Sequence, residues 1–144
     1  MNVEKTKWHI WVVGVLSLLW NAGGAFDYLS MKFGSAAYQE MLSPEQLAYF
    51  NSYPLWINIA WPVAVWGAVL GSLLILLRNQ WAVAAFAVSL VAMLLNVLYG
   101  YALADPGMVD IAGPFELAFT AAIVIVGVLL LHYARRMRDA GQLR

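Results

Sequence analysis

The sequence predicts an all-α membrane protein, a four-transmembrane-helix bundle with short amphipathic interfacial helices between its first two spans. Hydrophobic residues fill 63% of the 144 positions and charged residues only 11%, whereas about a quarter of the residues of a soluble domain are charged. Four long apolar runs are separated by polar segments, and about 18 apolar residues suffice to cross the hydrocarbon core of a bilayer. We therefore expect one transmembrane domain over residues 1–144.

The first predicted span covers residues 8–28. Trp8 and Trp11 stand at its start, where amphipathic rings favour the membrane interface. Two lysines before the apolar run and small residues near its end also fit, loosely, a signal peptide cleaved after about residue 25. The acidic Glu4 and the tryptophans within the run favour a retained anchor helix. Retention is our expectation, with cleavage as the alternative.

The segment of residues 30–53 is the longest polar stretch, and it carries signals for two short helices. Ser43 is a good N-cap, Pro44 suits a first helical position, and Glu45 suits the positive end of a helix. Apolar and aromatic residues recur at helical spacing after Pro44, a pattern typical of a helix at a membrane interface. The alternative is a segment that packs only on the end of the bundle.

The other three spans are predicted at residues 54–77, 81–104 and 115–133. The second contains 24 residues, which as a helix reach about 36 Å, enough to cross with some tilt. Residues 78–80 form a tight turn, so the third span should be an antiparallel neighbour of the second. Residues 105–114 form a loop bounded by proline and glycine, and a basic tail follows the fourth span.

The distribution of charge predicts how the bundle is oriented. An even number of spans places both termini on one side, and seven of the eight lysines and arginines then lie on that side, with Lys32 alone on the other. Six of the eight acidic residues lie on the side of Lys32. By the positive-inside rule, both termini are expected in the cytoplasm.

Each span carries a stripe of small or polar residues at helical spacing. Small residues let helix backbones approach closely in lipid, so we expect these stripes to face one another. Gly23 and Gly24 should allow such an approach in the first span. Gly67 and Gly71 should do so in the second, or should form the contact of a parallel homo-oligomer if the bundle leaves them free. The stripes of the first two spans are Ser17, Asn21, Gly24 and Tyr28, and Ala60, Ala64, Ala68 and Ser72.

The larger polar side chains gather in the half of the spans that faces away from the termini. An ionisable residue inside a membrane is a hypothesis of function by default. The sequence thus predicts an outward-facing polar pocket. The alternatives are hydrogen bonding between helices for the asparagines, a headgroup position for Asp27 and a helix-capping role for Glu116. The predicted pocket residues are Asn21, Asp27, Asn58, Asn96, Tyr99, Glu116 and Thr120.

Other kinds of site find little support in the sequence. There is no cysteine, and His9 and His132 have no nearby third ligand, so we expect no metal site. No phosphate loop, nucleophile elbow or zinc-helix motif is present, so we expect no catalytic residue and no cofactor, and an enzyme is the least favoured reading. A net charge of zero and the absence of a basic patch argue against nucleic acid.

Three stretches carry a resemblance to a group of proteins. They resemble small bacterial inner-membrane proteins, a largely uncharacterised group of which some members carry an automatic sugar-transporter label. The resemblance covers most of the first three spans and implies a multi-pass four-helix bundle in the bacterial inner membrane. It implies no established chemistry, so no functional residue is carried over. The stretches are Leu19-Trp20-Asn21…Gly24…Phe26-Asp27-Tyr28, Ser43-Pro44-Glu45-Gln46-Leu47-Ala48-Tyr49-Phe50 and Trp66-Gly67…Leu70-Gly71-Ser72-Leu73-Leu74.

These observations favour a binding or accessory protein of the lipid bilayer, whose outward-facing pocket holds a lipid, a small molecule or a partner subunit. The alternative is an oligomeric small-solute transporter, because four short spans make a small transporter unless several chains combine. The seven-to-one charge bias argues against an antiparallel dimer of mixed orientation. A parallel homo-oligomer remains open.

Overall fold

A computed structural model of the chain describes residues 5–144, and the predicted all-helical fold class is confirmed within this range. Four of its helices, α1, α4, α5 with its continuation η1, and α7, are long and apolar enough to cross a membrane. The elements are α1 (His9–Phe33), α2 (Ala36–Glu40), α3 (Pro44–Asn51), α4 (Leu55–Leu76), α5 (Ala82–Leu98), the π-helix η1 (Tyr99–Leu103), α6 (Met108–Ala112) and α7 (Pro114–Asp139).

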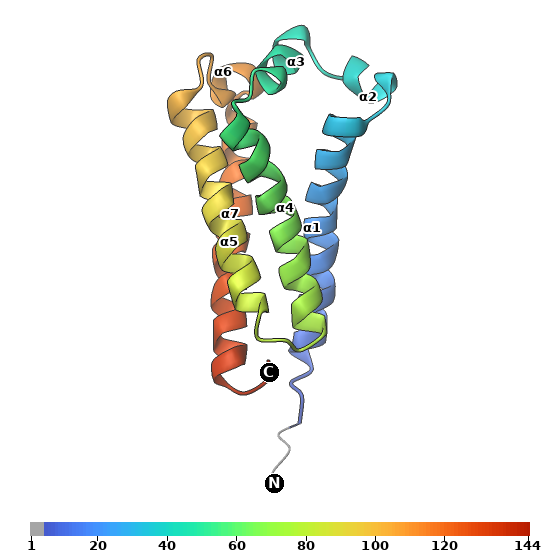
Figure 1. Cartoon of the computed structure of the whole chain (residues 1–144), viewed down its shortest axis with the longest axis vertical. Helices are drawn as coiled ribbons and strands as arrows, with labels where there is room; N and C mark the ends of the chain where they lie inside the picture. Colours follow the sequence, from blue (N-terminus) through green and yellow to red (C-terminus); the bar gives the residue numbers. More distant parts are fainter. Residues whose placement is uncertain (1–4) are drawn as a thin grey trace.

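The four long helices run antiparallel in chain order, so the start of α1, the C-terminus and the α4–α5 turn lie at one end of the bundle (Figure 1). We call this the terminal end. The short helices α2, α3 and α6 lie at the opposite end, the loop end. Helix α4 packs on both α1 and α5, and α5 packs on α7. Helices α1 and α7 are therefore the first and last members of the bundle.

The glycines of α4 are used inside the bundle, against α5. A Cβ atom at Gly71 would lie 2.7 Å from the ring of Phe86, and one at Gly67 would lie 3.0 Å from Cβ of Ser89. The Ser89 hydroxyl donates to the carbonyl of Ala64 across the same interface. The predicted packing role of this face is therefore correct, and the face is not free to form a homo-oligomer contact.

The prediction for Gly23 and Gly24 was wrong. A Cβ atom at either position would meet no atom within 4 Å, so neither glycine permits a close approach between helices. The inward face of α1 instead contains Gly14, where a Cβ would overlap the side chain of Leu76, and the buried Ala25. With 3.6 residues per turn, a step of four residues returns closer to the same helix face than a step of three. Ala25, four residues after Asn21, is therefore nearer to the inward face than Gly24.

The main hydrophobic core lies toward the terminal end, where all four long helices contribute to it. Its members come from α1, α4, α5, α7 and the C-terminal tail: Ile10, Ile75, Ala82, Phe86, Leu130, Ala134, Met137 and Leu143. Many other large apolar side chains along the spans are exposed on the bundle surface. Such a surface is suited to contact with lipid chains rather than water.

The polar segment between the first two spans forms α2 and α3, as its two helical signals predicted. The Ser43 hydroxyl accepts a hydrogen bond from the Gln46 amide at 3.1 Å, and the Gln46 side chain accepts one from the Ser43 amide at 3.0 Å. These two bonds form a capping box, which satisfies donors at the helix start. Tyr49 of α3 is buried and its ring lies against Tyr99, so the segment packs on the loop end.

Two spans run further than the sequence predicted, because α1 continues to Phe33 and α7 to Asp139. The apolar composition of a span shows where the chain leaves the membrane. The helix can continue past that point, because it satisfies its own backbone hydrogen bonds. Helix α7 ends in a Schellman motif. Gly141 has φ +71°, and the Gln142 amide donates to the Met137 carbonyl at 2.9 Å. This cap turns the C-terminal tail back toward the bundle.

Candidate functional site

The structure separates the seven residues of the predicted polar pocket into several small groups. Asn21 lies between α1 and α4, where its side-chain amide donates to the Ala68 carbonyl at 3.2 Å and to the Ser72 hydroxyl at 3.0 Å. The Asn96 side chain donates at 2.8 Å to the carbonyl of Ala92 in its own helix. The Asn21 contacts fit the alternative of hydrogen bonding between helices, whereas the Asn96 bond stays within α5.

Asn58 and Tyr99 both contact Tyr53, in an aromatic cluster at the loop end. Asn58 donates to the Tyr53 carbonyl at 2.9 Å and accepts a bond from the Lys32 ammonium group. That ammonium group also lies 5.6 Å from the centroid of the Trp61 ring, within the range of a cation–π interaction. The cluster ties the loop end of α1 to α4. Its rings are Tyr28, Tyr49, Phe50, Tyr53, Trp56, Trp61 and Tyr99.

Glu116 and Thr120 of α7 both contact Tyr101, a residue that was not predicted to belong to the pocket. The hydroxyl of Tyr101 in η1 is 2.9 Å from the Thr120 hydroxyl and donates to the Glu116 carbonyl at 3.4 Å. Glu116 is also within electrostatic range of Asp27 on α1. These two carboxylates of the predicted pocket lie on different helices, α1 and α7, and influence each other through their charges.

Asp27 accepts a hydrogen bond from the Tyr38 hydroxyl of α2 at 2.8 Å. Burial of the phenol, then the hydrogen bond and the charge of Asp27, raise the pKa of Tyr38 from 10.0 to about 12. A raised phenol pKa means that folding favours the neutral form. Its contribution to stability is therefore complete below pH 10 and is lost as the pH rises from about 10 to about 12.

We predict that Asp27→Asn lowers the pKa of Tyr38, because it removes the negative charge of Asp27, which is one of the causes of the shift. The measurement is a titration of ¹³Cζ-tyrosine NMR signals, with Tyr38→Phe to assign the resonance. A wild-type Tyr38 that titrates at its ordinary value of 10.0 would show that the α1–α2 hydrogen bond does not form in solution.

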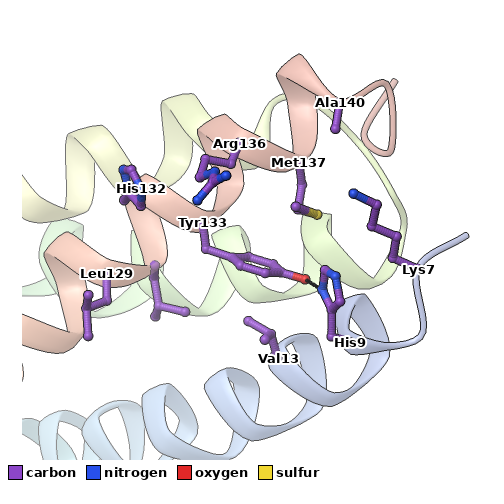
Figure 2. Close-up of a pocket in the computed structure, with 10 residues that line it drawn as sticks. Lys7, His9, Val13, Leu129, His132, Tyr133, Arg136, Met137 and Ala140 are labelled. Atoms are coloured by element: carbon purple, nitrogen blue, oxygen red, sulfur yellow. Dashed lines mark hydrogen bonds between the residues drawn. The ribbon is translucent and has the colours of Figure 1, made fainter.

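A cavity of about 620 Å³ lies at the terminal end between α1 and α7 (Figure 2). Its size is within the range of ligand pockets, which is about 300–1,000 Å³. The polar pocket predicted from the sequence lies in the opposite half of the spans, so this cavity was not predicted. The lining residues are Lys7, His9, Val13, Leu129, Leu130, His132, Tyr133, Arg136, Met137 and Ala140.

Helical spacing presents the lining residues to the cavity. Leu129, Tyr133, Arg136 and Ala140 follow one another at steps of four, three and four along α7, so they share one face. The Tyr133 hydroxyl reaches across to Nδ1 of His9 on α1, at 2.6 Å (Figure 2). The two rings meet edge to face, with centroids 5.6 Å apart. This pair joins α1 to α7 within the cavity wall.

The C-terminal tail fixes the position of Lys7 at the cavity. The Lys7 amide donates to Oε1 of Gln142 at 3.0 Å, and the Gln142 side chain is only 1% exposed. The Gln142 carbonyl accepts a bond from Nε of Arg78 at 3.1 Å. Three segments far apart in the sequence therefore meet beside the cavity.

The side chains around the cavity are of two chemical kinds. Four carry basic nitrogen, namely Lys7, His9, His132 and Arg136, and no aspartate or glutamate is among the ten lining residues. The others are apolar apart from Tyr133. Within residues 5–144, no three histidine, aspartate or glutamate side chains come together as a metal site. The arrangement is therefore suited to an anionic group attached to an apolar one.

Four apolar helices in an antiparallel bundle, with a cavity at one end, define a multi-pass membrane protein of four spans. No known family model, no curated protein and no solved structure matches the chain. The resemblance to small bacterial inner-membrane proteins therefore stays a prediction.

Proposed function

We propose that the protein is a multi-pass protein of the bacterial inner membrane, with both termini in the cytoplasm, that binds an amphiphilic ligand in the cavity between α1 and α7. The observation that carries this proposal is the cavity itself, about 620 Å³ in volume, with basic and apolar walls. The orientation rests on the seven basic residues of the terminal end and on the positive-inside rule.

The depth of the cavity supports an amphiphilic ligand. Trp8 and Trp81 lie at the terminal end and are 73% and 67% exposed, and tryptophan prefers the boundary between lipid and water. Leu129, which lines the cavity, is 59% exposed on the bundle surface. A ligand in the cavity would therefore have its polar part near the headgroups and its apolar part near the lipid chains.

The outward-facing pocket of the sequence analysis stays a prediction, and it has less geometric support than the cavity. The side-chain amides of Asn21, Asn58 and Asn96 already donate hydrogen bonds to the protein. The acidic residues Asp27 and Glu116 are not among the residues that line the cavity between α1 and α7. We therefore keep the binding or accessory role that the sequence predicts, and we propose that the ligand binds at the terminal end and not in the outward-facing half.

The alternative, an oligomeric small-solute transporter, is less well supported. At mid-depth the helices enclose a void of about 20 Å³ beside Asn21 and Ser89, which has room for about one water molecule. Transport would require a different conformation or a path between chains. The Gly67 and Gly71 face cannot provide the contact between chains, because α5 covers it.

The proposal predicts that filling the cavity expels the ligand. Val13 lines the cavity, and Val13→Trp should reduce the bound lipid or small amphiphile at least about tenfold, because the added ring occupies its space. Native mass spectrometry of protein released from bacterial membranes would measure the bound fraction.

Val12→Trp is the matched control. Val12 is the neighbouring residue of α1, 44% exposed and outside the cavity lining, so the same substitution there should leave the bound fraction unchanged. The proposal fails if the wild-type protein retains no ligand, or if Val13→Trp retains as much as Val12→Trp.

A further inference from the structure

The basic groups at the cavity come from both sides of it. Lys7 and His9 belong to the start of α1 and the residues before it, whereas His132 and Arg136 belong to α7. Figure 2 shows Arg136 above the Tyr133 ring and the Lys7 side chain extending toward Met137 from the opposite side, so Met137 stands between the two basic groups in this view. Groups of one sign that converge without an acidic residue between them favour an anion there.

Among the residues that the structure describes, the acidic residue closest in sequence to the basic groups of the cavity is Asp139, three residues after Arg136, and it is engaged elsewhere. Asp139 accepts a bond from Nε of Arg138 at 3.1 Å and forms an ion pair with that guanidinium group. Neither Asp139 nor Arg138 lines the cavity. The charges of Lys7 and Arg136 are therefore not neutralised by a carboxylate of the cavity wall.

An apolar wall adjoins these basic groups. Val13, Leu129 and Leu130 line the cavity next to His9 and His132. A free inorganic anion would gain nothing from such a wall, whereas a lipid would place an acyl chain on it and its headgroup beside the basic residues. Basic pockets between transmembrane helices on the cytoplasmic side are suited to phosphate headgroups.

We infer that the ligand of the proposed function is an anionic phospholipid, whose phosphate is held by Lys7 and Arg136 at the cavity between α1 and α7. Arginine binds phosphate oxygens through paired N–H groups, and lysine binds them as a point charge. The acyl chain lies along Val13 and Leu129. The Tyr133–His9 hydrogen bond holds the two helices at the separation that admits the headgroup.

The test compares lipids that differ only in charge. Purified protein in neutral detergent is titrated with phosphatidylglycerol and with phosphatidylcholine of the same acyl chains, and occupancy is measured by native mass spectrometry. The wild-type protein should bind phosphatidylglycerol at least about tenfold more tightly. The double variant Lys7→Gln/Arg136→Gln should lose this preference and still bind phosphatidylcholine.

The control removes the same charges outside the cavity. Lys5 and Arg135 are exposed and absent from the cavity lining, so Lys5→Gln/Arg135→Gln should keep the preference for phosphatidylglycerol. If this control loses the preference as fully as the cavity variant does, the selectivity comes from overall charge and the inference is wrong. Thermal unfolding of both variants checks that they remain folded.

This inference rests on the proposed function, and the outcomes separate the two. Equal binding of the two lipids by the wild-type protein would overturn the anionic headgroup and leave the amphiphile site standing. Binding of neither lipid would overturn both. Competition by inorganic phosphate at concentrations near the lipid Kd would show that the site takes a free anion, and the lipid would then be the wrong ligand.

Discussion

Gly71→Ala should lower the free energy of unfolding by about 1–3 kcal/mol, the usual cost of overpacking a tight contact. A Cβ atom at Gly71 would lie 2.7 Å from the Phe86 ring, and Phe86 is only 2% exposed in the core between α4 and α5. The ring has little room to move, so α4 and α5 must separate or Phe86 must leave its rotamer. Unfolding by sodium dodecyl sulfate in mixed micelles, followed by tryptophan fluorescence, measures the change.

The matched control is Gly24→Ala in α1. A Cβ atom there would meet nothing within 4 Å, so stability should be unchanged or should rise by up to about 1 kcal/mol through the higher helix propensity of alanine. The opposite sign of the two effects is the informative result. Equal destabilisation by both substitutions would mean that α1 packs on its neighbours in a different rotation.

Gln142→Ala should lower the free energy of unfolding by about 1–3 kcal/mol, because it removes a buried side chain and the part-buried hydrogen bond that this side chain accepts. Gln142 is 1% exposed, and its Oε1 accepts the amide of Lys7 at 3.0 Å. The substitution therefore detaches the residues before α1 from the C-terminal tail. Hydrogen exchange of the Lys7 amide should become faster, and chemical denaturation in detergent should report the loss of stability.

Gln80→Ala is the control for Gln142→Ala. Gln80 lies at the same end and its side chain is exposed, while its backbone amide donates to the Arg144 carbonyl at 3.1 Å, a bond that alanine retains. Neither stability nor exchange at Lys7 should change in this variant. Unaltered exchange at Lys7 in Gln142→Ala would contradict the role assigned to the tail.

The sequence was sufficient to predict the four spans and their antiparallel order. A membrane restricts a chain with long apolar runs to a few architectures, because every backbone group must find its partner within the lipid. The helix ends were less predictable. Helix α7 continues to Asp139, six residues beyond the predicted end at 133, because arginine-rich sequence can stay helical outside the membrane.

The cavity could not be predicted, because sequence periodicity does not say which helices are neighbours. The step of four from Leu129 to Tyr133 and from His9 to Val13 was visible, but the meeting of α1 with α7 was not. The C-terminal tail was also taken for a plain basic extension. Gly141, after a run of basic residues, is the signal that could have indicated a helix cap and a reversal of the chain.

The polar residues of the spans were predicted to form an outward-facing pocket, but the asparagines among them form hydrogen bonds to the protein. Asn21 bonds α1 to α4 through Ser72, and Asn96 bonds its own helix. An amide in lipid gains a partner wherever one is near, so its presence in a span does not by itself identify a binding site. For Asp27 and Glu116, a role in ligand binding stays a hypothesis.

The most direct test of a lipid in the cavity between α1 and α7 is a solution NMR measurement in nanodiscs of deuterated protein and protonated phosphatidylglycerol. The side chain of Met137 lines the cavity and is only 8% exposed, so lipid in the cavity would lie beside its methyl group. The predicted result is a nuclear Overhauser effect between this methyl group and the lipid, with none at the buried Ile75. A Met137 methyl group as isolated from lipid as Ile75 would contradict the proposed site.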